Sequence, residues 1–540
     1  MSGPGAGTGA PSSRLTGRWL VAAGIGVAVV VAFGVALRFW TKSALWLDEA
    51  LTVNIARRPI HEIPSYLKRD GAPPLYYLLL HFWMWLLGTS DLAVRSLTGV
   101  LSVFTLPIAW LAGRRFGGRT VAWMALVLLA SAPFAIYYAT EARMYALVMF
   151  LVACGFLALE RVLSRPQVGN LVALAVVSAA LLYTQYWAIY LIASLALWLI
   201  WQAWRGRSDR RSPTRYALGS IVVGCVAFLP WMPTFIYQSA HTGTPWSKPP
   251  NFAAIINAVT GFTDNQATLS TAGSNQGRLL AVFYFALGAL ALFGVARDRW
   301  HIELDIRTRR PGRGLTFVVV FTLAAAITGG IITGSAFSPR YASVIFVPLL
   351  VLVAYGTLTL ADARVRACIM ALMAVAGLAA GVENVWTQRT QAPQIATAVQ
   401  AHAAPGDIVA YCPDQLGPSV YRLTGPGYHQ LTYPRATGPA YVDWVDYKTV
   451  AARSNPADFA RHLEQLAGTT HDIWLVSAPG YQGFGIKCEQ LAGYLAEAPG
   501  YGAHQWVNAN PDQYYEPMQL TQFAPPSAGA VPTPAASAAP

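Results

Sequence analysis

Long runs of apolar residues alternate with short polar stretches along most of this 540-residue chain. A helix that crosses the hydrocarbon layer of a bilayer needs about 20 consecutive, mostly apolar residues. The apolar runs meet this requirement at residues 19–39, 97–113, 121–138, 144–163, 168–183, 187–204, 216–236, 279–296, 315–335, 341–360 and 365–381. The pattern therefore predicts a multi-span α-helical membrane protein with about 11 transmembrane helices.

The segment at residues 73–88 is apolar and aromatic but short, and it begins with Pro73 and Pro74. Counting it as a span would reverse the orientation of every later helix. The arginine clusters between the runs therefore decide whether this segment crosses the membrane. The clusters are Arg114, Arg115 and Arg119; Arg161 and Arg165; Arg205, Arg207, Arg210, Arg211 and Arg215; Arg297, Arg299, Arg307, Arg309, Arg310 and Arg313; and Arg364 and Arg366. An interfacial segment places all of them on the side of the N-terminus, and basic loops mark the cytoplasm. We therefore predict a cytoplasmic N-terminus and an extracytoplasmic first loop at residues 41–93.

The chain becomes polar after the last predicted span. Residues 394–401, 456–466 and 489–497 have helical patterns, and residues 407–411 and 472–477 have strand patterns. They predict an extracytoplasmic α/β domain over residues 383–523, following a transmembrane domain over residues 18–382. The two ends, residues 1–17 and 524–540, are rich in small residues and proline and are predicted to be disordered.

Composition agrees with a membrane location, because 55% of the residues are hydrophobic and only 12% are charged. The net charge of +13 would suit a nucleic-acid partner, but the basic residues lie in the clusters between spans, which argues against one. The excess of arginine over lysine is typical of a GC-rich bacterial genome, so we expect a bacterial plasma membrane. Cys412 and Cys488 lie in the polar C-terminal region, where an oxidising location would allow one disulfide. The spacing of His and Cys residues predicts no metal site.

The first outer loop contains the most informative candidate chemistry. Asp48 and Glu49 are adjacent carboxylates that follow Trp46 just beyond the first span. A carboxylate at the membrane surface among aromatic and apolar side chains is partly desolvated, which is typical of functional sites. The alternative interpretation is structural: the same carboxylates would form an ion pair with Lys42 or a nearby arginine at the membrane interface.

Several short motifs follow one another in a characteristic order and loop placement. They are Asp48-Glu49, Pro73-Pro74-Leu75-Tyr76-Tyr77, Ser90-Asp91-Leu92-Ala93-Val94-Arg95, Gly113-Arg114-Arg115-Phe116-Gly117, Thr140-Glu141-Ala142-Arg143-Met144-Tyr145 and Pro339-Arg340-Tyr341. Together they resemble the GT-C superfamily of polyprenyl-phosphate-sugar-dependent glycosyltransferases, especially the branch of protein O-mannosyltransferases and lipid A aminoarabinose transferases. The resemblance is good over residues 15–165, thinner to about residue 380, and absent from the C-terminal region. The family places its Pro-Pro segment in a juxtamembrane helix, as the arginines predict here.

The resemblance implies an inverting transfer of a monosaccharide, of the arabinofuranose or mannose class, from a polyprenyl phosphate donor. The acceptor would be a cell-envelope glycan, a glycolipid or a protein on the extracytoplasmic face. It implies that Asp48 is the catalytic base, with Glu49 and Glu141 as further catalytic candidates. Candidate ligands of the donor phosphate are Arg340, Lys68, Arg69, Arg143 and Tyr341, and candidate contacts of the sugar or acceptor are Tyr76, Trp46, Gln185 and Tyr186.

One departure from the family concerns the donor phosphate. Relatives commonly carry Lys or His immediately before the Pro-Pro pair, whereas this chain has Ala72. Lys68, Arg69 or Arg340 would then have to supply the positive charge. No cofactor is expected beyond the lipid-linked donor, and a divalent cation stays an open alternative.

Simpler structural explanations remain for several of these residues. Glu141 can pair with Arg143 at a helix end, Arg340 can snorkel to the interface, and Tyr186 can belong to an aromatic belt. A transporter or flippase for a lipid-linked saccharide is the alternative function. Transporters carry ionisable residues near the bilayer midplane, whereas the acids of this chain gather in its outer loops and the spans are nearly free of charge.

Overall fold

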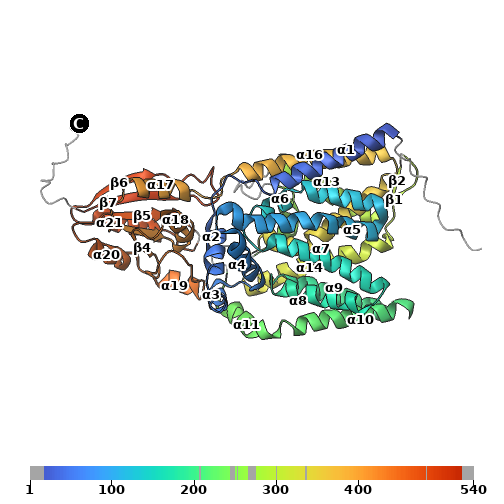
Figure 1. Cartoon of the computed structure of the whole chain (residues 1–540), viewed down its shortest axis with the longest axis horizontal. Coiled ribbons are helices and arrows are strands. Elements are labelled where there is room, and N and C mark those ends of the chain that lie inside the picture. Colours follow the sequence, from blue (N-terminus) through green and yellow to red (C-terminus); the bar gives the residue numbers. More distant parts are fainter. Residues whose placement is uncertain are drawn as a thin grey trace, which may run out of the picture. The chain divides into compact units, whose positions relative to one another are not determined.

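The computed structural model describes residues 17–205, 208–243, 250–251, 253–264, 275–299, 301–334, 337–481 and 483–525. Most of the two ends predicted to be disordered, residues 1–17 and 524–540, lies outside these ranges. Internal contacts divide the chain into two compact units (Figure 1). The membrane unit consists of Met1–Ser43 and Ile55–Thr387, and the C-terminal unit consists of Ala44–Asn54 and Gln388–Pro540.

The membrane unit is a bundle of helices, as the apolar runs predict. Its α-helices are α1 (Gly17–Leu37), α3 (Ile63–Asp70), α4 (Leu75–Leu87), α5 (Asp91–Ser131), α6 (Pro133–Ala139), α7 (Tyr145–Ser164), α8 (Val168–Leu182), α9 (Ala188–Arg205), α10 (Ser208–Val226), α11 (Met232–His241), α12 (Ala253–Gly261), α13 (Asn275–Phe293), α14 (Arg310–Thr333), α15 (Ser343–Gly356) and α16 (Ala363–Trp386). Three 3-10 turns (Leu229–Trp231, Pro339–Ala342 and Thr357–Thr359) and a hairpin of β1 (Gly294–Ala296) and β2 (Ile302–Leu304) complete it.

Nine stretches of the described residues are long and apolar enough to cross a membrane, and α5 is one of them. However, α5 is not one straight helix, because Gly117 and Gly118 have non-helical backbone angles. A Cβ on Gly113 would lie 3.1 Å from the Cα of Ala122, which is nine residues later. In a straight helix, nine residues would separate the two positions by about 13.5 Å along the axis. The chain therefore reverses between two helical arms, which match the predicted spans at residues 97–113 and 121–138.

Two shorter apolar helices remain, Leu75–Leu87 and Val168–Leu182. α8 covers the predicted span at residues 168–183, so each of the eleven predicted spans coincides with helical structure. α4 has 13 residues and is therefore about 20 Å long, well short of the roughly 30 Å hydrocarbon layer. This length is the one expected of the interfacial segment at residues 73–88.

The C-terminal unit is an α/β fold built on a five-stranded sheet of order β4-β3-β5-β7-β6. β3 pairs in parallel with β4 and β5, whereas β7 pairs antiparallel to β5 and β6. The strands are β3 (Ile408–Cys412), β4 (His429–Thr432), β5 (Ile473–Ser477), β6 (Gly502–Val507) and β7 (Gln519–Ala524). The helices are α17 (Ala392–His402), α18 (Gly417–Thr424), α19 (Tyr447–Arg453), α20 (Pro456–Ala467) and α21 (Lys487–Glu497), with a 3-10 turn at Asp414–Leu416.

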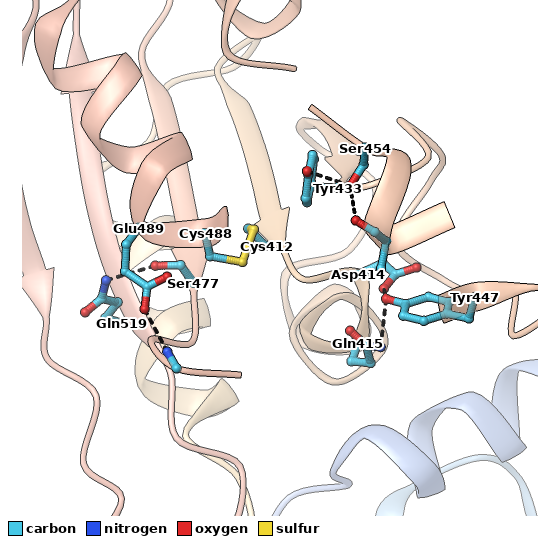
Figure 2. The surroundings of a disulfide bond; sticks show 12 residues. Cys412, Asp414, Gln415, Tyr433, Tyr447, Ser454, Ser477, Cys488, Glu489 and Gln519 are labelled. Atoms are coloured by element: carbon cyan, nitrogen blue, oxygen red, sulfur yellow. Dashed lines mark hydrogen bonds between the residues drawn. A yellow bond between two sulfur atoms is a disulfide. The ribbon is translucent and has the colours of Figure 1, made fainter. Parts of the chain in front are cut away.

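Helices cover both faces of this sheet. On one face, Tyr411 and Trp474 pack in a core with Ile395 of α17 and Val420 of α18. Successive strand residues point to opposite faces, so Cys412 lies on the other face. There it forms a disulfide with Cys488 of α21 (Figure 2). The structure thus contains the disulfide that the sequence allowed.

The boundary between the two units differs from the one predicted at residue 383. Helix α16 continues to Trp386 without interruption, and the C-terminal unit begins at Gln388. A further segment, Ala44–Asn54, belongs to the C-terminal unit although it lies in the predicted first outer loop. Sequence patterns could not show this, because the segment is separated from the rest of its unit by more than 300 residues.

Candidate functional site

Asp48 and Glu49 lie in the first turn of α2 (Leu47–Ala56). Acidic residues at the start of a helix are stabilised by its dipole. The two carboxylates nevertheless differ, because Glu49 is fully buried whereas Asp48 is half-buried. Oε2 of Glu49 lies 3.9 Å from Nη1 of Arg389, and both side chains are completely inaccessible.

A third carboxylate, that of Glu516, adjoins this turn. Its Oε1 accepts a hydrogen bond of 3.3 Å from the backbone N–H of Leu47, and the ring of the neighbouring Tyr515 lies edge-on to Trp46 at 5.1 Å between centroids. Burial raises the pKa of Glu516 to about 8, and the charge of Asp48 adds to this effect. Hydrogen bonds from Thr390 and Ser419 act in the opposite direction.

Sequence reasoning missed Glu516 and Arg389. Neither residue belongs to a motif, and both are more than 330 positions away from Glu49 in the chain. The only local signal is that Glu516 follows two tyrosines, Tyr514 and Tyr515, whereas Arg389 stands among threonine and glutamine residues and has no such signal. The proximity of Glu516 and Arg389 to α2 follows from the tertiary structure alone.

A second group of candidates lies in the membrane unit, around the turn that follows α6. Glu141 is buried and Arg143 is half-buried. Nη1 of Arg143 donates to the hydroxyl of Tyr77 at 3.3 Å, and this hydroxyl donates to Oδ2 of Asp70 at 2.8 Å. This chain of bonds connects the ends of α3 and α4 to the turn that contains Glu141.

Arg340 lies in the 3-10 turn Pro339–Ala342. Its guanidinium stands 5.4 Å from the ring centre of Tyr341, and Tyr341 in turn packs on Trp187 at 5.6 Å between centroids. The buried Tyr138 is within electrostatic reach of both Arg340 and Glu141. The structure therefore gathers an acid and a cation of the predicted site around one tyrosine.

Gln185 and Tyr186 have structural contacts. Oε1 of Gln185 accepts from the hydroxyl of Ser343 at 3.3 Å. The hydroxyl of Tyr186 donates to Gln238 and accepts from Nε1 of Trp231 at 2.9 Å. Gln238 also donates to the carbonyl oxygen of Leu67 in α3 at 2.7 Å, so Tyr186 helps to hold this helix.

The other predicted residues of the first outer loop differ in exposure. Lys68 is exposed, with its ammonium 4.0 Å from the ring centre of Tyr237. Arg69 is also exposed, whereas Tyr76 is buried against Tyr77 with their ring centroids 6.3 Å apart. Arg95, at the end of one recognised motif, is buried and donates to the carbonyl oxygen of Ser43 at 2.6 Å. Within the described ranges, no group of three or more His, Cys, Asp or Glu side chains could hold a metal ion.

Another buried acid of the C-terminal unit, Asp414, directly follows β3 (Figure 2). Asp414 accepts a hydrogen bond from the hydroxyl of Tyr447, and Nε2 of Gln415 donates to the same hydroxyl at 2.8 Å. Burial raises the pKa of Asp414 to about 7, and the bond from Tyr447 and the charge of Arg435 oppose this rise. Asp414 is thus a second acid of this unit that titrates near neutral pH.

The comparison with family models finds one match. Residues 71–233 match the model described as dolichyl-phosphate-mannose-protein mannosyltransferase. This range includes the Pro-Pro segment and the turn with Glu141, but not α2. A comparison of the sequence with curated proteins finds no match.

Several solved structures share the fold. ArnT from Cupriavidus metallidurans bound to undecaprenyl phosphate is 13% identical, with a TM-score of 0.58 over 96% of this chain and 99% of that chain. AglB from Archaeoglobus fulgidus, in complex with an inhibitory peptide and a dolichol-phosphate, is 12% identical. Its TM-score is 0.51 over 89% of this chain and 72% of that chain. The mycobacterial arabinofuranosyltransferase AftD is 13% identical, with a TM-score of 0.50 over 96% of this chain but only 41% of that longer chain. At these identities the likeness shows the fold, which is the predicted one.

Proposed function

We propose that this chain is a membrane glycosyltransferase of the GT-C type that transfers a monosaccharide from a polyprenyl phosphate to an acceptor hydroxyl. Its fold and the family match over residues 71–233 support this proposal. The similar ArnT and AglB structures contain undecaprenyl phosphate and dolichol-phosphate, which supports a lipid phosphate as the leaving group. The sugar is of the mannose or arabinofuranose class. The acceptor is a cell-envelope glycan, glycolipid or protein on the extracytoplasmic face.

The proposed reaction is a single displacement at the anomeric carbon. The acceptor oxygen attacks that carbon from the face opposite the phosphate, and Asp48 takes the hydroxyl proton. The bond between the anomeric carbon and the phosphate oxygen breaks, and its electron pair leaves with the polyprenyl phosphate. The configuration at the anomeric carbon is inverted. Cationic side chains stabilise the charge of the departing phosphate, and Arg340, Arg143, Lys68 and Arg69 are the candidates.

The observation that carries this assignment is the difference between Asp48 and Glu49. Glu49 is completely buried next to Arg389, which suits a structural ion pair. Asp48 is half-buried at the first turn of the same helix, where a carboxylate remains accessible to an acceptor. Glu141 is assigned to positioning the acceptor or the donor, because it is buried and shares Tyr138 with Arg340.

The test is transfer of labelled sugar from undecaprenyl-phosphate mannose and undecaprenyl-phosphate arabinofuranose to membrane acceptors. Asp48→Asn should lower the transfer rate by about 10²- to 10⁴-fold, the usual contribution of a general base, without altering thermal stability. The matched control is Glu62→Gln, because Glu62 is an acid of the same loop that lies at the surface near Arg58; it should transfer like wild type. Full activity of a folded Asp48→Asn protein would contradict the assignment. Movement of a lipid-linked saccharide across vesicles without any transfer would favour the flippase alternative.

A further inference from the structure

The helix that carries Asp48 belongs to the C-terminal unit. Ala44–Asn54 clusters with Gln388–Pro540 by its contacts, while the intervening chain Ile55–Thr387 forms the membrane unit. Asp48, the acid proposed as the base, is therefore positioned by the C-terminal unit. The Asp48-Glu49 pair is the only motif of the GT-C resemblance that belongs to this unit. Which side chains hold it can be read from the contacts within this unit.

Two polar contacts join the first turn of α2 to residues far away in the chain. The backbone N–H of Leu47 donates to Oε1 of Glu516 at 3.3 Å. The carboxylate of Glu49 lies 3.9 Å from the guanidinium of Arg389, and neither side chain has any solvent exposure. Asp48 lies between Leu47 and Glu49 in the chain, so both of its neighbours are held.

The other end of the segment is attached as well. Nδ2 of Asn54 donates to the carbonyl oxygen of Ala440 at 2.8 Å, and the hydroxyl of Tyr441 donates to the carbonyl oxygen of Asn54 at 3.2 Å. These bonds limit movement of α2 along its axis. Its first turn is in addition contacted by Glu516 and Arg389.

Glu516 and Arg389 are themselves joined through the backbone. The N–H of Glu516 donates to the carbonyl oxygen of Arg389 at 2.7 Å, and the N–H of Gln391 donates to the carbonyl oxygen of Glu516 at 3.1 Å. The two side chains that hold the turn therefore share one support, formed by the segments that lead into α17 and β7. A change at either residue should reach Asp48 through this support.

We propose that Glu516 and Arg389 are positioning residues, which fix the first turn of α2 so that the carboxylate of Asp48 has one orientation toward the acceptor. This inference rests on the function proposed above for Asp48. Fixed geometry of this kind matters because a shift of a reacting group by about 1 Å can cost roughly 100-fold in rate.

The charges around Glu516 support a neutral acid at this position. Asp48 of α2 and Tyr481, which follows β5, interact with it electrostatically, and the hydroxyls of Thr390 and Ser419 bond to it. The positive charge of Arg389 is matched by Glu49. Because the pKa of Glu516 is raised to about 8, its carboxyl is mainly protonated at pH 7 and adds little negative charge beside Asp48.

A measurement on the full chain can test the positioning without knowledge of the sugar. Hydrogen exchange of the backbone amides at residues 44–54, followed by mass spectrometry in detergent, should be about tenfold faster in Glu516→Ala than in wild type. Glu516→Gln keeps an oxygen that accepts from Leu47 and stays neutral, so it should restore slow exchange. The control is Asp414→Asn, which changes a buried acid of the same unit that has no hydrogen bond to α2 and should leave residues 44–54 protected. Equal exchange in wild type and Glu516→Ala would overturn the proposal.

Transfer kinetics then separate positioning from reaction. With undecaprenyl-phosphate mannose or arabinofuranose as donor, Glu516→Ala and Arg389→Met should lower kcat more than they raise KM, and Glu516→Gln should recover kcat. We expect kcat of wild type to fall above pH 8, where Glu516 becomes charged beside Asp48. This fall should be absent in Glu516→Gln. A Glu516→Gln protein with protected residues 44–54 but no activity would mean that Glu516 itself exchanges a proton, which contradicts a positioning role. If wild type uses neither donor, the proposed function fails, whereas the exchange result still decides the positioning.

Discussion

The two units of this protein bury acids and arginines in different proportions. Among the described residues, the membrane unit buries Arg38 and Arg95 together with Glu141 and Asp362, whereas the C-terminal unit buries four acids and one arginine, namely Glu49, Asp407, Asp414, Glu516 and Arg389. Arg38 donates to the carbonyl oxygens of Gly34, Leu129 and Ala130 at 2.6 to 2.9 Å. Backbone carbonyl groups do not titrate, so the acceptors of these bonds are the same at pH 5 and at pH 8.

The buried acids of the C-terminal unit behave differently. Asp414 and Glu516 have pKa values raised to about 7 and about 8, mainly by burial. Their charge thus changes within the range in which proteins normally work. We infer that the two units respond differently to pH, and that the segment carrying Asp48 follows the response of the C-terminal unit.

The largest expected effect is therefore a pH-dependent loss of stability in the C-terminal unit. A carboxyl group whose pKa is higher in the folded state binds its proton more tightly there, so stability is greatest below the unfolded value near 4 and falls as pH rises to about 7 for Asp414 and 8 for Glu516. One pKa unit corresponds to about 1.4 kcal/mol, so each group can contribute several kcal/mol. Hydrogen exchange of β3 and β5 in the full chain between pH 5 and 8 measures this loss.

Neutral substitutions provide the control for this pH dependence. Asp414→Asn and Glu516→Gln remove the titrating groups, so each should flatten the pH profile of the C-terminal unit, and together they should remove most of it. The helices of the membrane unit should show the same protection at pH 5 and pH 8 once intrinsic exchange is corrected. An equally steep loss in the membrane unit would contradict the contrast between the units.

The second prediction concerns the disulfide between Cys412 and Cys488, which are 76 positions apart. Replacing both residues by serine should destabilise the C-terminal unit by about 2–4 kcal/mol, because the bond restricts the unfolded chain. Denaturant unfolding, followed by exchange of β3 and α21, is the measurement. Cys368→Ser is the matched control, because Cys368 is an exposed free cysteine on α16 of the membrane unit and its loss should change neither unit.

The sequence predicted the elements better than it predicted their partners. The apolar runs of span length coincide with helical structure, including both arms of α5, because membrane helices are determined largely by local hydrophobicity. The strands β3 and β5 were also visible as local apolar runs. The resemblance picked out Asp48 and Glu49 but not which of them is buried, since Arg389 and Glu516 reach α2 only through long-range folding. Local patterns contain no information on such pairs.

The smallest predicted effect belongs to the membrane unit and tests its insensitivity to pH. Tyr77→Phe removes the hydroxyl that joins Arg143 to Asp70, and loss of such a bond costs about 1 kcal/mol. The midpoint of thermal unfolding of the membrane unit should fall slightly and by the same amount at pH 6 and pH 8, because the unperturbed pKa values of aspartate, tyrosine and arginine side chains all lie outside this range. Tyr216→Phe is the control, since Tyr216 is exposed on α10 and its hydroxyl joins no comparable network within the described part of the chain. A decrease that grows between pH 6 and pH 8 would show that the outer loops of the membrane unit share the titration of the C-terminal unit, and the contrast between the two units would then have to be abandoned.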